Sequence, residues 1–237
     1  MSHFTVAVIC HDLDDVDILL EPFNEQTENI AYLEFNPASE SDEEMIATYK
    51  EQLNAGKNYD SYEDFLLGYY GYHIDPKVGR PGYNSNPNAA WDWWQIGGRW
   101  SNMLKTKSNG RGNMAPIKDI DFTPDPDEYN RAIRFWEVVV EGQPLRDHES
   151  QDDFFSFYNA QYYIDQFGTK EKYAEDCAGF STWAFLTPEG EWVEKGAMGW
   201  WGMNDATNNS RDAYKEAFKK ALETYSDCWI VIVDCHI

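Results

Sequence analysis

Two apolar segments, one near each end of the sequence, most constrain the fold. Residues 3–10 read "HFTVAVIC" and residues 228–237 read "CWIVIVDCHI". Apolar and β-branched residues dominate both segments, a pattern that is typical of strands buried on both faces of a sheet. We therefore expect both segments to be buried strands, which makes them candidates for pairing with each other.

The chain between these strands mixes helical and strand patterns without a regular strand-helix-strand alternation. Helical spacing follows a capping residue or a proline at residues 41–53, 61–69, 125–136, 152–167, 169–177 and 210–225. Strand patterns are found at residues 29–35 and in a hairpin over 180–198 that turns at "TPEG". The sequence predicts one α+β domain over residues 1–237, with a mixed or antiparallel sheet that includes both terminal strands, helices packed on it, and a helical insertion at 125–178.

The composition predicts a folded protein with an aromatic core. Of the 237 residues, 42% are hydrophobic, and the chain holds ten Trp, fifteen Tyr and thirteen Phe. Four scattered cysteines are too few for a disulfide scaffold in a chain of this length, so reduced thiols are expected. No segment approaches the eighteen apolar residues of a membrane span, and the start "MSHFTVAVIC" has no basic leader, so we expect a cytoplasmic protein without membrane contact.

A net charge of −23 disfavours nonspecific binding to DNA, RNA or anionic membranes and favours a protein partner with a basic surface. Twelve Asp and Glu lie in residues 12–44, before the first Lys or Arg at Lys50. The candidate protein-binding residues are Asp12, Asp14, Asp15, Asp17, Asp42, Glu43 and Glu44. The run "HDLDDVD" lacks the glycine and distal glutamate of a calcium loop, so it is read as a solvated acidic face and no metal is expected.

The segment "WDWWQIGGRW" at residues 91–100 is the strongest candidate for a ligand site. Tryptophan faces, a glycine pair and an arginine together suit a nucleotide or another phosphorylated ligand. The alternative is that the rings pack the core, the glycines form a bulge and Arg99 pairs with Asp92. The candidate ligand-binding residues, with a second cluster "GAMGWWGMN" and the terminal histidine, are Trp91, Trp93, Trp94, Gly97, Gly98, Arg99, Trp100, Trp200, Trp201 and His236.

Two Cys-His dipeptides, at residues 10–11 and 235–236, raise the question of a zinc site or a thiolate nucleophile. Adjacent residues of a strand face opposite ways, so only one member of each dipeptide could serve a given site. No CxxC or HxxxH spacing supports a metal site. A buried thiol beside a hydrogen-bonded histidine is the expected arrangement, and neither a catalytic residue nor a cofactor is assigned.

Four motifs in order, "MSHFTVAVI", "WDWWQIGGRW", "GEWVEKGAMGWWGM" and "VIVDCHI", resemble a group of uncharacterised proteins found mostly in tailed bacteriophages and in some bacteria. The likeness covers the chain in outline and brings no activity or catalytic residue with it. It implies that the group shares Trp91, Trp93, Gly97, Gly98, Arg99, Trp100, Gly199, Trp200, Trp201, Gly202, Asp234, Cys235 and His236. It also implies that the protein acts in the cytoplasm of an infected host cell.

The sequence leaves two functions open. The first is a non-enzymatic phage accessory protein that acts on a host or defence protein, in counter-defence or host takeover, with its acidic residues mimicking nucleic acid. The second is a protein that binds, sequesters or hydrolyses a nucleotide-like small molecule in a pocket of Trp, Gly and Arg, with His236 as the candidate base.

Overall fold

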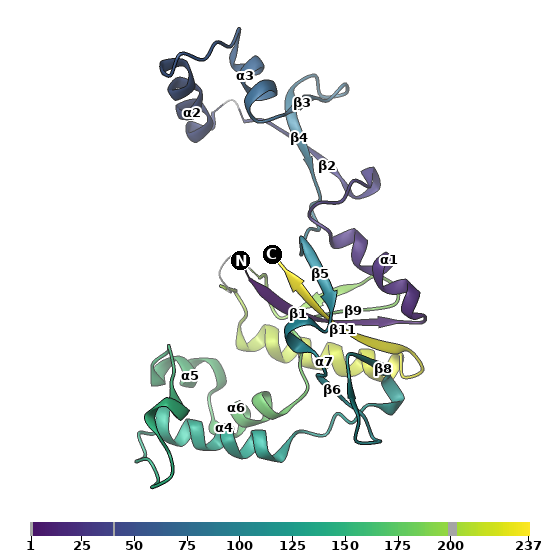
Figure 1. Cartoon of the computed structure of the whole chain (residues 1–237), viewed down its shortest axis with the longest axis vertical. Coiled ribbons are helices and arrows are strands. Elements are labelled where there is room, and N and C mark those ends of the chain that lie inside the picture. Colours follow the sequence, from purple (N-terminus) through teal and green to yellow (C-terminus); the bar gives the residue numbers. More distant parts are fainter. Residues whose placement is uncertain (1, 40, 199–202) are drawn as a thin grey trace. The chain divides into compact units, whose positions relative to one another are not determined.

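The computed structural model describes residues 2–39, 41–198 and 203–237 (Figure 1). The chain forms two compact units. Unit 1 comprises Met1–Leu20 and Trp93–Ile237, and unit 2 comprises Glu21–Asp92. Segment 125–178, the predicted helical insertion, lies within unit 1.

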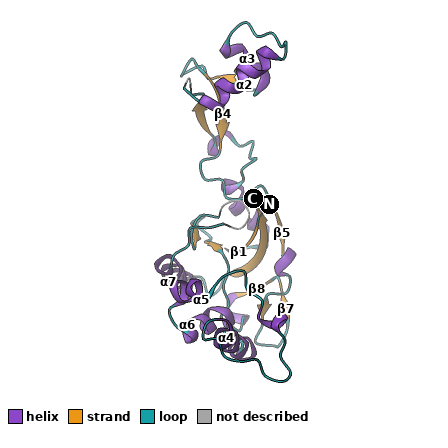
Figure 2. Ribbon diagram, turned by 90° about the vertical axis from the view of Figure 1, so that its left-hand side faces the viewer, coloured by secondary structure: helices purple, strands orange, loops and turns teal. Residues whose placement is uncertain are grey.

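The sheet of unit 1 is built around the two terminal strands, as predicted. Strand β1 (His3–Cys10) pairs antiparallel with β11 (Trp229–His236) over eight residue pairs, and the two ends of the chain lie side by side (Figures 1 and 2). The strand order is β10-β9-β1-β11-β5, and β8 also pairs with β11. The other strands are β5 (Trp93–Ile96), β8 (Met114–Pro116), β9 (Ala184–Leu186) and β10 (Trp192–Glu194). Since β9 runs parallel to β1 and antiparallel to β10, the sheet is mixed and the α+β class is confirmed.

Helix α7 (Asn208–Thr224) covers one face of this sheet (Figure 1). Its buried Tyr214, Phe218 and Ala221 share a hydrophobic core with Ile9 and Ile232 of the central strands. Thr207 caps the helix, three residues before the predicted start at Ser210. The short elements near the start of unit 1 are η1 (Leu13–Asp15) and α1 (Val16–Leu20).

The remaining part of unit 1 holds a group of helices and several short elements (Figure 2). The helices are α4 (Pro126–Val139), η6 (Gln151–Phe154), α5 (Ala160–Phe167) and α6 (Lys170–Ala178). Asp125 caps α4 and Thr169 caps α6, as expected. The single helix predicted over 152–167 is instead divided, because Asn159 caps a new helix at Ala160. The short elements are η4 (Gly98–Trp100), β6 (Leu104–Lys105), β7 (Arg111–Gly112) and η5 (Ile117–Asp119).

Unit 2 has its own small sheet and core. Its elements are η2 (Glu21–Phe23), η3 (Ile30–Tyr32), β2 (Glu34–Pro37), α2 (Glu43–Asn54), α3 (Tyr62–Tyr69), β3 (His73–Ile74) and β4 (Pro81–Ser85). The strands have the order β2-β4-β3, and Phe65 and Leu66 of α3 are buried among tyrosines. The strand predicted at 29–35 begins only at Glu34, because Asn29 caps a turn of 3-10 helix. Helix α2 is capped by Asp42 rather than by Ser41.

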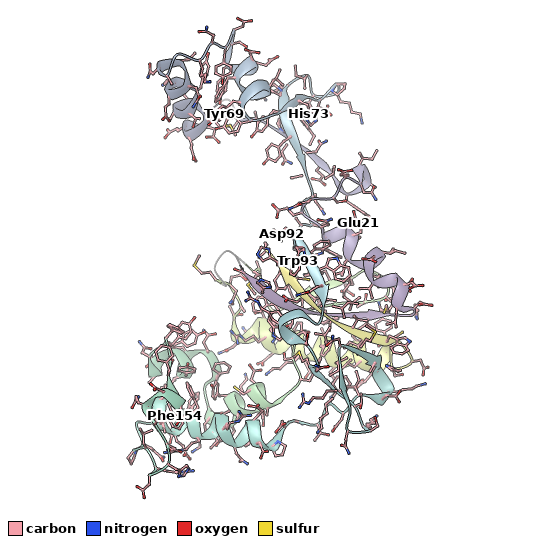
Figure 3. The ribbon with its side chains drawn as sticks, viewed as in Figure 1. Glu21, Tyr69, His73, Asp92, Trp93 and Phe154 are labelled. Carbon is pink, nitrogen blue, oxygen red and sulfur yellow. The ribbon has the colours of Figure 1, made fainter. Side chains whose placement is uncertain are left out.

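The two ends of unit 2 are joined by hydrogen bonds. Asn24 and Trp91 form a bridge, and the Ala90 N–H donates to the Phe23 carbonyl. Buried Asn86 donates from its amide to the carbonyls of Pro22 and Asn24. Glu21 and Asp92, the first and last residues of the unit, are labelled in Figure 3. The chain therefore enters and leaves unit 2 at neighbouring points.

Within the described part of the chain, no helix is long and apolar enough to cross a membrane.

A nearly buried arginine connects α4 to the loop that follows it. The Arg134 guanidinium donates to both carboxylate oxygens of Glu149, at 2.8 and 2.6 Å, and to the Pro144 carbonyl at 2.9 Å. Its third anchor is Glu137, one turn along the same helix. The hydrogen bonds from Arg134 lower the pKa of Glu149 from 4.5 to about 2. Arg134 therefore holds the loop most strongly when Glu149 is ionised.

Replacing Glu149 with Gln is expected to lower the thermal midpoint at pH 7, by roughly 5 °C. Because the folded-state pKa is depressed, the contribution of Glu149 is complete above pH 4.5 and is lost as the pH falls toward 2. The difference in midpoint between the parent and E149Q should therefore shrink over this interval. Glu128→Gln, which removes an exposed pair with Arg131 in the first turn of the same helix, is the control and should have a much smaller effect at pH 7. A pH-independent difference for E149Q would contradict this assignment.

Candidate functional site

A histidine and a buried aspartate meet at the end of the central strand pair. The register of β1 and β11 places His3 opposite His236 and Thr5 opposite Asp234. The Asp234 side chain is completely buried, and its Oδ1 lies 2.8 Å from His3 Nδ1. Since an ionised carboxylate only accepts hydrogen bonds, the proton is assigned to His3 Nδ1. His3 Nε2 is then the ring nitrogen left for a ligand or a proton.

The second oxygen of Asp234 binds the glycine-rich turn after β5. The Arg99 backbone N–H donates to Asp234 Oδ2 at 3.0 Å. Gly98 has a φ of +49°, and a Cβ on it would lie 2.3 Å from that oxygen. Gly97 has a φ of +73°, and a Cβ there would lie 2.4 Å from the Asn113 amide nitrogen. Both glycines are therefore required by close contacts inside the protein, namely a carboxylate and an amide.

Trp93 forms the exposed side of this cluster. Its side chain is 46% exposed, and its ring stands edge-on to His3 at 6.1 Å and to His236 at 6.4 Å. The rings of His3 and His236 are 5.0 Å apart. We define the His-Trp cluster as His3, Asp234, His236, Trp93 and the backbone of Arg99.

The other tryptophans of segment 91–100 do not gather around Trp93. Trp91 is buried in unit 2, and Trp100 packs against the main core of unit 1. Trp94 follows Trp93 in β5, so its side chain points to the opposite face of the sheet. Strand β5 begins only at Trp93, so Trp91 and Trp93 do not form a pair on one face of a strand. Trp200 and Trp201, with Gly199 and Gly202, lie outside the described residues.

The Arg99 side chain is exposed, and its guanidinium forms no ion pair with any residue that the structure describes. A free guanidinium can form paired hydrogen bonds to a phosphate or carboxylate.

No group of three His, Cys, Asp or Glu side chains among the described residues is placed to hold a metal ion. The chemistry that the cluster itself supports is stacking of a flat ligand on the exposed Trp93 ring, or proton transfer through His3.

The two Cys-His dipeptides lie at opposite ends of the central strand pair. Cys10 is opposite Trp229, whereas Cys235 is opposite Phe4. Both thiols are fully buried, and burial raises the pKa of Cys10 to about 11 and that of Cys235 further. His11 Nδ1 lies 3.3 Å from the Sγ of Cys228, a different cysteine. A shared zinc site or a thiolate nucleophile in these dipeptides is therefore disfavoured.

The acidic candidates are divided between the two units, and several cap helices. In unit 1, Asp12 caps η1, and Asp15 completes the capping box. In unit 2, Asp42 accepts hydrogen bonds from the backbone N–H groups of Glu44 and Met45. The exposed acids among them are Asp12, Asp14 and Asp17 in unit 1 and Glu43 and Glu44 in unit 2. Local helix stabilisation thus accounts for part of this charge.

Residues that sequence reasoning missed are His3 as a partner of Asp234 and a group of four tyrosines in unit 2, three of them exposed. The sequence could have indicated His3 if the expected pairing of the terminal strands had been extended to a residue-by-residue register, because that register places "SHF" opposite "DCH".

The tyrosines Tyr69, Tyr70, Tyr72 and Tyr83 form a chain of ring contacts with centroid separations of 5.1 to 5.5 Å. Tyr69 and Tyr83 are 47% and 45% exposed. Figure 3 labels Tyr69 on α3.

Gly98→Ala tests the close contact with Asp234. Gly190 is the matched control, because it has a φ of +84° but no atom lies within 4 Å of the place that a Cβ would take. Gly190→Ala should cost on the order of 1 kcal/mol of unfolding free energy from backbone strain alone. Gly98→Ala should cost clearly more, since it adds the collision with the carboxylate. Urea unfolding measures both, and equal losses would count against the close approach.

Comparison of the chain with family models, with curated proteins and with solved structures found no match.

Proposed function

We propose that this protein is a binding protein whose unit 2 attaches to a basic surface of another protein. The observation that carries the proposal is the chain of four tyrosines, of which Tyr69, Tyr70 and Tyr83 are exposed, on a strongly acidic unit. Residues 21–92 contain fourteen Asp and Glu but only four Lys and Arg. Tyrosine is enriched at protein interfaces, where it offers a large rigid surface and a polar hydroxyl.

The chemistry of this surface favours arginine over lysine in the partner. A guanidinium stacks on a tyrosine ring and pairs with a nearby carboxylate at the same time, whereas an ammonium acts mainly as a point charge. Glu63 and Asp64 lie in the first turn of α3, the helix that carries Tyr69. The same combination of negative charge and flat rings supports mimicry of nucleic acid, and a host or defence protein that binds nucleic acid would be the corresponding partner.

The test uses immobilised peptides of ten arginines or ten lysines, which have equal charge. The intact protein should bind the arginine peptide several-fold more tightly, and salt should weaken both interactions. Tyr69→Ser with Tyr83→Ser should remove the preference for arginine while leaving the salt dependence. Tyr158→Ser, an exposed and stacked tyrosine of unit 1, is the control and should change neither. Equal binding of both peptides by the intact protein would contradict the proposed role of the tyrosines.

A second function, binding of a nucleotide-like ligand, is supported by the His-Trp cluster. Its exposed Trp93 can stack on a base, and the Arg99 guanidinium is available for a phosphate. The Asp234 contact also fixes the backbone position of Arg99, which orders the site before a ligand arrives. His3 Nε2 joins His236 as a candidate base for hydrolysis.

Thermal-shift measurements with a panel of nucleotides test this second function. A nucleotide that binds should raise the midpoint of the parent, and Arg99→Ala or Trp93→Ala should abolish the shift. Arg111→Ala, an exposed arginine at β7, is the charge-matched control for Arg99→Ala and should retain it. The absence of any shift in the parent protein would exclude this function for the nucleotides tried.

A further inference from the structure

An apolar groove lies between α7 and two neighbouring segments of unit 1, and none of the candidate site residues discussed above lines it. Its walls are formed mainly by Ile117, Ile120, Phe122, Phe180, Phe218 and Leu222, and its volume is about 480 Å³. The rings of Phe122 and Phe180 meet edge to face at 5.4 Å, and Phe180 stacks on Phe218 at 5.9 Å. Sites for small organic molecules typically have volumes of about 300 to 1,000 Å³ and mainly apolar walls.

The rim of the groove is positively charged, although the whole chain carries a net charge of −23. Lys107, Lys215 and Lys219 line it, and Glu223 is its one acidic lining residue. Asp176 neutralises Lys215 through a salt bridge. The Lys107 Nζ donates to the backbone carbonyl of Lys118, and neither Lys107 nor Lys219 forms an ion pair with any described residue. Within the described ranges, two ammonium groups therefore remain without a carboxylate partner at the edge of an apolar surface.

A hydroxyl group on the wall adds a polar contact. Ser181 lines the groove, and its Oγ lies 2.6 Å from the Nζ of Lys195. Lys195 lies behind the wall, 5.2 Å from the centre of the Tyr214 ring. Burial lowers the pKa of Lys195 to about 8, so the amine still carries a proton at neutral pH. Because the ammonium only donates, Ser181 accepts from it and keeps its own hydroxyl proton for a ligand.

We propose that this groove binds an anionic amphiphile, a small molecule with an apolar acyl or aryl body and a negatively charged head group. The body lies against the phenylalanines, and the head lies at the edge near Lys107 and Lys219. Charge complementarity selects this class of ligand. On a surface of high negative charge, a merely apolar patch would attract cationic amphiphiles, whereas the free lysines reverse that preference locally.

Three ten-carbon probes that differ only in the head group test the proposal: decanoate, decanol and decyltrimethylammonium. Each is titrated into the full-length protein below its micelle concentration, and binding is measured by calorimetry. Decanoate should bind at least tenfold more tightly than the other two. Backbone amide NMR shifts should locate it at residues 117–122 and 179–181. Tighter binding of the cationic probe, or decanoate shifts that avoid these segments, would overturn the proposal.

Neighbouring lysines on α7 supply matched variants. Lys219→Glu changes a groove residue, whereas Lys220→Glu makes the same change of charge at an exposed residue that does not line the groove. Lys219→Glu should weaken decanoate binding about tenfold, and Lys220→Glu should change it less than twofold. Circular dichroism checks that both variants remain folded, as expected for exposed helix positions. Equal losses in the two variants would show that general charge, rather than this groove, governs binding and would overturn the proposal.

Discussion

The antiparallel pairing of β1 with β11 is the constraint on which the rest of unit 1 depends. Eight consecutive residue pairs join segments that are more than 200 positions apart in the sequence. Every other strand of the main sheet is added to one of these two or to their neighbours, and α7 packs on the face that they create. A shift of one residue in their register would turn the apolar side chains to the wrong face and would separate His3 from Asp234.

The same pairing also explains why polar chemistry is confined to the ends of a strongly apolar pair of strands. Ala7, Ile9, Ile230 and Ile232 fill the middle against α7, where an unpaired charge would be costly. The Asp234 carboxylate can be completely buried because both of its oxygens accept hydrogen bonds, one from His3 and one from the Arg99 backbone N–H. The glycine at position 98 allows the second of these bonds. The segment "WDWWQIGGRW" is therefore divided in role: Trp93 and Arg99 face outward, while Gly98 serves the interior.

Local sequence patterns predicted most of the helices and strands, but they did not predict which of these elements contact one another. The terminal strands, the hairpin of β9 and β10, and the caps at Ser61, Asp125 and Thr169 each follow from a few adjacent residues. The division of segment 91–100 between two units depends on hydrogen bonds of Phe23 and Asn24 to residues 90 and 91, which no local pattern shows. The groove likewise combines residues from positions 107 to 223, so neither its shape nor its charge could be read from any one stretch.

The neighbouring entry and exit points of unit 2 have a consequence for how this architecture can change. An inserted unit whose two ends are hydrogen-bonded to each other occupies the position of a single loop in the unit that carries it. A different insert with adjacent ends could therefore be joined to unit 1 at the same two positions, after Leu20 and before Trp93. The proposed binding surface of unit 2 and the main sheet of unit 1 thus belong to separate stretches of the sequence.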